Sequence, residues 1–150
     1  MINKKEFIQY LEAYFSEKAL LIHQEIEQLR ADISSDTKST AGDKHETSRA
    51  MAQLEMEKLG NQILDYHKKI QWIKQLGLEN PASETIQTGS LIRLSNGWYF
   101  LGPGLGKITF GNEHVFCISI KSPIGQQLFN KKKGQLIELS GKELCIESIF

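Results

Sequence analysis

Two carboxylates, Asp43 and Glu46, stand three residues apart in the sequence Gly-Asp-Lys-His-Glu. Carboxylate oxygens are ligands that Mg²⁺ prefers, and such a pair can complete the coordination of a metal held mainly by another molecule. The same spacing is also that of a capping box, in which Asp caps a helix and Glu follows three residues later. The spacing by itself favours the capping interpretation, and the two interpretations are compatible.

These acids belong to a polar segment, residues 34–46, between two stretches with an apolar residue at every third or fourth position. The first stripe comprises Ile8, Leu11, Phe15, Ala19, Ile22, Ile26, Leu29 and Ile33, and the second comprises Ala52, Met56, Leu59, Ile63, Tyr66, Ile70 and Ile73. Two apolar helix stripes joined by a short polar connection pack antiparallel. Residues 1–78 are therefore predicted to form a coiled-coil hairpin with an acidic tip. At about 1.5 Å per residue, each arm should reach roughly 40 Å.

The pattern changes after Gly77, where Gly and Pro residues indicate the end of the helix and a linker at residues 79–84. Residues 85–150 contain short apolar runs separated by Gly and Asn, which predict antiparallel strands joined by hairpins. The predicted strands are residues 90–94, 98–101, 107–110, 114–120, 135–139 and 143–149. Ser122 as N-cap and Pro123 at the first helical position predict one short helix. The fold class is α+β.

The composition excludes several functional classes. The 150-residue chain has 18 basic and 18 acidic residues, so its formal net charge is zero and it has no excess of cations with which to neutralise nucleic-acid phosphates. It contains no apolar run long enough to cross a bilayer, and its first residues are charged and amphipathic. We therefore expect a cytoplasmic protein that does not bind nucleic acid on its own or associate with a membrane.

Two motifs resemble those of a known family. The segment Cys-Ile-Ser-Ile-Lys-Ser-Pro-Ile-Gly-Gln-Gln-Leu-Phe, which begins at Cys117, resembles the C-terminal domain of the bacterial Gre transcript-cleavage factors. Gly42-Asp43-Lys44-His45-Glu46-Thr47 resembles the tip motif of the same family, in which Gly-Asp is followed by Glu three residues after the Asp. The order of the two parts, a coiled-coil hairpin and then a small α+β domain, is also that of the family.

This resemblance implies an FKBP-like C-terminal domain and a role in transcription elongation. The domain would dock on RNA polymerase through Lys121, Ser122, Pro123 and Ile124, and the hairpin would enter the secondary channel. Asp43 and Glu46 would act in trans as catalytic acids and metal ligands, only within the polymerase complex. The polymerase, with its own Mg²⁺, would then cleave backtracked RNA at the nascent 3′ end. The factor itself would be a monomer without a cofactor, and not an enzyme.

The sequence also departs from the family pattern and leaves two alternatives. Arg49 and Ala50 stand where the family has Glu-Tyr, and Lys121 stands where it often has Asp or Asn. These changes fit a secondary-channel regulator that does not stimulate cleavage. The other alternative is an FKBP-type prolyl isomerase with a coiled-coil arm. Its active site would need an aromatic pocket, for which the candidates are Trp98, Tyr99, Phe100, Phe110 and Phe116.

Overall fold

The computed structural model describes residues 1–36, 42–79 and 83–150, with the backbone alone at residues 36, 42–45 and 79. The chain divides into two compact units. One consists of Met1–Leu11 together with Trp72–Phe150, and the other of Glu12–Gln71. Residues 80–82 of the predicted linker, 79–84, lie outside the described residues, as does the middle of the predicted tip, residues 37–41.

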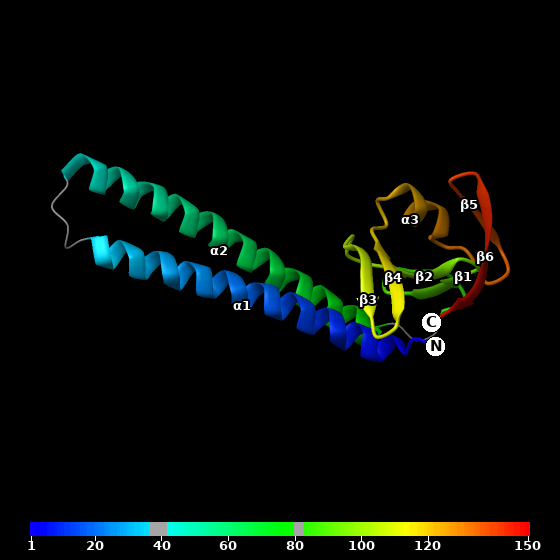
Figure 1. Cartoon of the computed structure of the whole chain (residues 1–150). Coiled ribbons are helices and arrows are strands. Elements are labelled where there is room, and N and C mark those ends of the chain that lie inside the picture. Colours follow the sequence, from blue (N-terminus) through cyan, green and yellow to red (C-terminus); the bar gives the residue numbers. More distant parts are fainter. Residues whose placement is uncertain (37–41, 80–82) are drawn as a thin grey trace. The chain divides into compact units, whose positions relative to one another are not determined.

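Two long helices form the N-terminal half of the chain, α1 (Lys4–Asp36) and α2 (Gly42–Glu79) (Figure 1). Within the unit Glu12–Gln71, Ile26 of α1 packs with Leu59 and Ile63 of α2 in a small buried cluster. Nearer the start of α1, the ring of Phe15 lies 6.0 Å from that of Tyr66, which is further along α2. The two helices therefore run antiparallel. The predicted helical hairpin is confirmed, and its apolar stripes meet as expected for this spacing.

The C-terminal half forms one six-stranded sheet and a short helix, α3 (Pro123–Leu128) (Figure 1). The sheet order is β3-β4-β2-β1-β6-β5. The strands are β1 (Leu91–Leu94), β2 (Gly97–Leu101), β3 (Gly106–Phe110), β4 (Glu113–Ile118), β5 (Leu136–Leu139) and β6 (Lys142–Ile149). The α+β class, the six strands and the short helix are thus confirmed.

One pair of neighbouring strands differs from the expected antiparallel pattern. β2 and β4 are parallel, with Trp98 opposite Val115 and Leu101 opposite Ile118. β3 lies between them in sequence but takes the outer position, antiparallel to β4. β2 therefore becomes an inner strand, buried at Trp98 to Leu101 on both faces, as is usual for parallel pairing.

Both faces of the sheet are covered within the unit Met1–Leu11 and Trp72–Phe150. On one face, Tyr99 and Leu101 belong to a buried cluster that includes Leu128 of α3. On the other face, the ring of Phe100 meets that of Phe7 in α1 edge to face, with 5.4 Å between their centroids. The successive residues of β2 alternate between the two faces, so the strand packs against both layers.

The ends of the two long helices belong to the same compact unit as the sheet. Buried side chains from these ends are Phe7, Ile8, Leu11, Ile73 and Leu76. α2 also continues past Gly77 to Glu79, two residues beyond the predicted stop. A Cβ at Gly77 would lie 3.3 Å from a methyl carbon of Ile8, so this glycine permits close packing of the two helices. From the sequence, all of these residues are predicted to belong to the hairpin domain, residues 1–78.

Candidate functional site

The first candidate site is the start of α2, where the two predicted acids lie. Asp43 is the second residue of the helix, and its side chain lies outside the described part of the structure. Glu46 lies near the start of the same helix, and its side chain is exposed. Residues three apart in a helix lie on neighbouring positions of one face, so the backbone places both acids on the same side of α2.

The position at which α2 begins bears on the capping interpretation. The helix starts at Gly42, so Asp43 stands inside its first turn and not at the flanking cap position. A carboxylate in the first turn interacts favourably with the positive end of the helix dipole, typically by about 0.3–1 kcal/mol. Asp43 and Glu46 therefore suit a helix start even without a capping box.

The donor chemistry of these acids fits a divalent cation that is shared with another molecule. Carboxylate oxygens are hard ligands of the kind Mg²⁺ takes, and Mg²⁺ is commonly held by only one or two protein carboxylates. Among the described residues, no group of three or more His, Cys, Asp or Glu side chains is placed to hold a metal. Two carboxylates do not fill the octahedral shell of Mg²⁺, so a cation bound by Asp43 and Glu46 would need further ligands.

The second candidate site is the start of α3, where Ser122 is the N-cap. Its extended backbone (φ −71°, ψ 154°) precedes the helix, and its hydroxyl oxygen accepts a hydrogen bond from the Gly125 N–H at 3.0 Å. The same hydroxyl donates to the carbonyl oxygen of Ser119 at 2.6 Å. Pro123 occupies the first helical position, where its missing N–H removes no helical bond. The local sequence is therefore explained by helix initiation.

Gly125 completes this helix start because the backbone passes very close to it. A Cβ added at Gly125 would lie 2.1 Å from the carbonyl oxygen of Ser119, which is shorter than any real contact. Only glycine leaves room for this approach. The helix start therefore explains three residues of the motif Ser-Pro-Ile-Gly, namely Ser122, Pro123 and Gly125.

The four predicted docking residues differ in exposure. Lys121 and Pro123 are exposed, and Ser122 is half-buried in the cap described above. Ile124 is half-buried and packs against the buried cluster between α3 and the sheet. The structure therefore exposes Lys121 and Pro123 at the surface, while Ile124 packs in part against the core.

Replacing Ser122 with Ala is expected to lower the free energy of unfolding by about 1 kcal/mol, because the Gly125 N–H loses its acceptor. Urea unfolding followed by circular dichroism measures this change. Lys121→Ala is the matched control, since an exposed side chain beside the cap should change stability by less than about 0.5 kcal/mol. Equal stabilities of Ser122→Ala and the parent would show that the cap contributes nothing.

The aromatic residues proposed for a prolyl isomerase pocket are not gathered around one cavity. Tyr99 and Phe116 stack on each other in the core, with ring centroids 5.2 Å apart. Phe100 and Phe110 pack around the first turns of α1. Trp98 lines an open pocket of ≈ 270 Å³ near Arg93, whose guanidinium carbon lies 5.3 Å from the Trp98 ring centroid. These rings mainly pack in the two apolar layers that cover the faces of the sheet.

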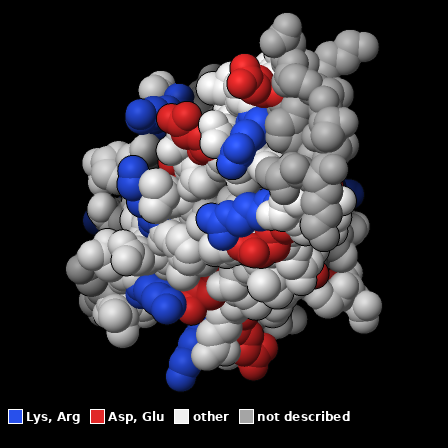
Figure 2. Space-filling model, turned by 90° about the vertical axis from the view of Figure 1, so that its left-hand side faces the viewer, with Lys and Arg blue, Asp and Glu red and all other residues white. Residues whose placement is uncertain are grey.

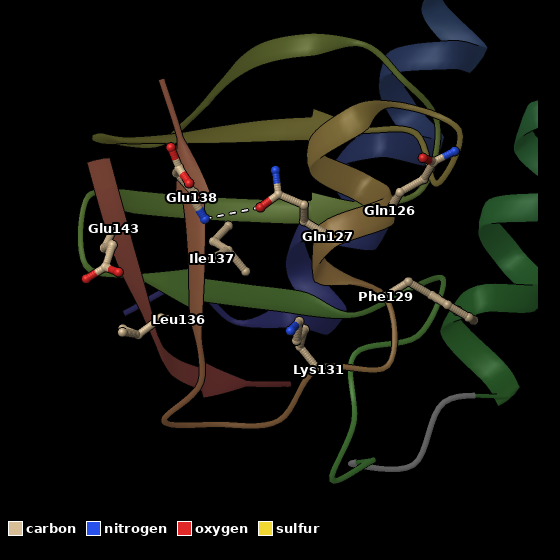
Figure 3. A pocket seen from close by; sticks show the side chains of 8 residues that line it. All are labelled: Gln126, Gln127, Phe129, Lys131, Leu136, Ile137, Glu138 and Glu143. Carbon is tan, nitrogen blue, oxygen red and sulfur yellow. Dashed lines mark hydrogen bonds between the residues drawn. The ribbon is translucent and has the colours of Figure 1, made fainter. Parts of the chain in front are cut away.

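A groove between α3 and β5 is a feature that the sequence did not indicate (Figure 3). Its volume is ≈ 360 Å³, and its lining residues are Gln126, Gln127, Phe129, Lys131, Leu136, Ile137, Glu138 and Glu143. The side-chain oxygen of Gln127 accepts a hydrogen bond from the Glu138 N–H at 3.1 Å across it. One signal was present in the sequence, since a two-residue turn at Ser140-Gly141 places Glu138 opposite Glu143.

The two cysteines take no part in either candidate site. Both are free thiols, with Cys117 buried in β4 and Cys145 half-buried in β6. Burial raises the pKa of Cys117 to about 12, so its thiol stays protonated at neutral pH. A protonated buried thiol is a poor nucleophile, and Cys117 acts as a small apolar core residue.

Charges of both signs occur together on one face of the molecule, in agreement with the neutral composition. On the face shown in Figure 2, Lys and Arg side chains are interspersed with Asp and Glu. Interspersed charges of both signs do not create the single-sign field that steers nucleic acid to a protein. Among the described residues, no helix is both long and apolar enough to span a membrane.

Comparisons with models of protein families, with curated proteins and with solved structures found no match for this chain.

Proposed function

We propose that this protein is a transcription elongation factor that binds RNA polymerase and inserts its helical hairpin into the secondary channel. The observation that carries the proposal is the combination of a long antiparallel hairpin with the sequence Gly-Asp-Lys-His-Glu at the start of its second helix. The resemblance to the Gre factors at both this motif and the Ser-Pro-Ile segment supports it. The protein is expected to act in the cytoplasm as a monomer.

In this function, Asp43 and Glu46 help the polymerase to cleave backtracked RNA. Their carboxylates would contribute ligands to a Mg²⁺ in the polymerase active site, where a metal stabilises the charge that develops on phosphate oxygens. The exposed side chain of Glu46 is available for such a contact. The factor is not an enzyme alone, because the reaction takes place on the RNA held by the polymerase.

The exposed residues before and at the start of α3 form the proposed docking surface. Lys121 and Pro123 present a cation and a rigid apolar ring, and the cap at Ser122 fixes the backbone between them. The hydrogen bonds of Ser122 hold this turn in one conformation before binding. A preorganised surface loses less conformational entropy when it binds, which favours affinity.

Reversing the charge of Lys121 is expected to weaken polymerase binding about fivefold, mainly by slowing association at low salt. Surface plasmon resonance with core polymerase, at two salt concentrations, measures the rates for Lys121→Glu. Lys133→Glu is the matched control, because Lys133 is also exposed but lies beyond α3. If the two variants bind equally well, the docking surface lies elsewhere.

A second candidate is a secondary-channel regulator that does not stimulate cleavage. It is favoured by Arg49, an exposed cation one turn after Glu46 on α2. A cation three residues from a carboxylate offsets part of its attraction for Mg²⁺. The cleavage assay on a stalled elongation complex separates the two candidates, since only the first predicts a faster release of short RNA 3′ fragments.

A further inference from the structure

The turn between β1 and β2 contains the only Asn-Gly pair of the sequence, Asn96-Gly97. Leu94 pairs with Gly97 where the two strands meet, so Ser95 and Asn96 form a two-residue turn. In such a pair the backbone nitrogen of the glycine can attack the side-chain carbonyl carbon of the asparagine, which closes a five-membered succinimide ring. Glycine permits this attack best, because it has no Cβ to obstruct the approach. The other asparagines of the sequence precede Lys, Gln, Pro or Glu.

The surroundings of Gly97 leave space for this ring closure. A Cβ added at Gly97 would meet no atom within 4 Å other than those of its chain neighbours. Its φ of 155° lies in a region that glycine enters far more readily than other residues. Gly97 is also the first residue of β2, and the ends of such elements open locally at a small cost in free energy. Asn96 itself is exposed, so water and base reach the turn.

The side chain of Asn96 is held at its nitrogen and not at its oxygen. Its Nδ2 donates a hydrogen bond to the hydroxyl oxygen of Tyr99 at 3.1 Å. Tyr99 is only 4% exposed, and its ring stacks on that of Phe116 with 5.2 Å between centroids. In the part of the chain that the structure describes, Oδ1 of Asn96 accepts no hydrogen bond. The nitrogen that would leave therefore faces the Tyr99 hydroxyl, while the carbonyl group has no partner.

We propose that Asn96 is a modification site, at which spontaneous deamidation converts the asparagine to aspartate and isoaspartate. The Gly97 nitrogen forms a bond with Cγ of Asn96 and loses its proton to solvent. The bond from Cγ to Nδ2 breaks, and Nδ2 takes up a proton and leaves as ammonia. Water then opens the succinimide at either of its two carbonyl carbons. One water is consumed and one ammonia is released, and no other reactant is needed.

The two products affect the turn differently. Aspartate keeps the original backbone, and the Tyr99 hydroxyl can donate a hydrogen bond to its carboxylate. In isoaspartate the main chain passes through the former side chain and gains one carbon. The neighbouring residue Ser95 donates its N–H to the Cys145 carbonyl oxygen at 3.1 Å, and its hydroxyl accepts from the Cys145 N–H at 3.3 Å. Because turn length sets strand register, isoaspartate is expected to weaken the pairing of β1 with its neighbours.

A second exposed asparagine offers a matched comparison within the same molecule. Asn112 lies in the two-residue turn between β3 and β4, where Phe110 pairs with Glu113. It differs from Asn96 in preceding a glutamate, whose side chain obstructs the backbone nitrogen. Asn112 should therefore keep its amide under conditions in which Asn96 reacts.

The experiment follows the mass of two tryptic peptides while the folded, full-length protein is kept in mildly alkaline buffer for several weeks. Residues 94–107 contain Asn96 and residues 108–121 contain Asn112, and neither peptide has another Asn or Gln. The first peptide is expected to gain one mass unit, since an NH₂ group becomes an OH group. Asn96 should react at least about tenfold faster than Asn112, which corresponds to a barrier lower by about 1.4 kcal/mol.

Chromatography against synthetic peptides should show both aspartate and isoaspartate at position 96, as a succinimide requires. The variant Asn96→Gln should keep its mass, because the longer side chain must close a six-membered ring. The isoaspartate form of the protein, once separated, should unfold at a lower urea concentration than the parent.

Four results would overturn the proposal. The first is an equal rate at Asn96 and Asn112, and the second is aspartate without isoaspartate, which indicates direct hydrolysis. The third is a mass gain in Asn96→Gln as fast as in the parent. The fourth is a peptide 94–107 that reacts in urea-unfolded protein and not in folded protein, since the turn would then protect the asparagine.

Discussion

Replacing Glu46 with Gln is expected to reduce stimulated RNA cleavage to the rate of the polymerase alone. Glutamine has nearly the same shape, but it lacks the negative charge that attracts Mg²⁺. The variant should still compete with the parent protein for polymerase, because the proposed docking residues lie in the other half of the chain. The measurement is the release of 3′ fragments from a backtracked complex with end-labelled RNA.

Asp43→Asn should have the same effect on cleavage as Glu46→Gln, since each removes one of the two charges. Glu57→Gln is the matched control for both, because it neutralises another exposed carboxylate of α2 and should leave cleavage unchanged. Full activity in Asp43→Asn or Glu46→Gln would show that the acids serve only the helix. No stimulation by the parent protein would favour the regulator without cleavage activity.

Stability measurements separate the role of Asp43 in the helix from its proposed role in cleavage. Because α2 begins at Gly42, Asp43 contributes through the helix dipole, and neutralising it should cost about 0.3–1 kcal/mol at most. Such a loss is too small to unfold the hairpin. A complete loss of cleavage in Asp43→Asn would therefore report on chemistry and not on folding.

Replacing Phe7 with Ala is expected to lower the free energy of unfolding by about 3–5 kcal/mol, the usual cost of removing a buried phenylalanine. Phe7 is completely buried, and its ring contacts those of Phe100 and Phe110 edge to face, with 5.4 Å between centroids in both cases. The alanine leaves a cavity in the layer between α1 and the sheet. Urea denaturation followed by tryptophan fluorescence measures the change, since Trp98 lies in the sheet.

Leu20→Ala is the matched control on the same helix, because Leu20 is 57% exposed. It should change stability by less than about 0.5 kcal/mol. Similar losses in the two variants would show that the start of α1 is not part of the core around the sheet. The same packing predicts that a fragment of residues 84–150 exposes Phe100 and aggregates, so docking is best tested on the full chain.

The hairpin and the strand positions follow directly from local sequence patterns. Apolar residues such as Ile26 and Leu59 recur with the helical period, and an apolar stripe of this kind must be buried against another. Turn signals such as Asn96-Gly97 and Ser140-Gly141 separate the strands, and both glycines adopt positive φ. These features depend only on residues close together in the chain, which is why the sequence predicts them.

The start of α3 is also predictable from the sequence, but the need for glycine at position 125 is not. The sequence identifies Ser122 as a cap and Pro123 as the first helical residue, and the structure confirms both. The requirement for glycine at position 125 arises from the approach of the Ser119 carbonyl, a contact that no spacing rule contains. The structure thereby adds a packing role for Gly125 to a motif that the sequence links to helix initiation and to docking.

The sequence by itself determined the elements, the acids at the start of α2 and the cap of α3, because periodicity and turn chemistry act over a few residues. Only the tertiary structure decided that β2 and β4 are parallel, that Phe7 packs on the sheet, and that Gln127 and Glu138 form one groove. Each of these depends on which face of one element meets another distant in sequence. Many such pairings bury similar apolar area, and local patterns do not distinguish between them.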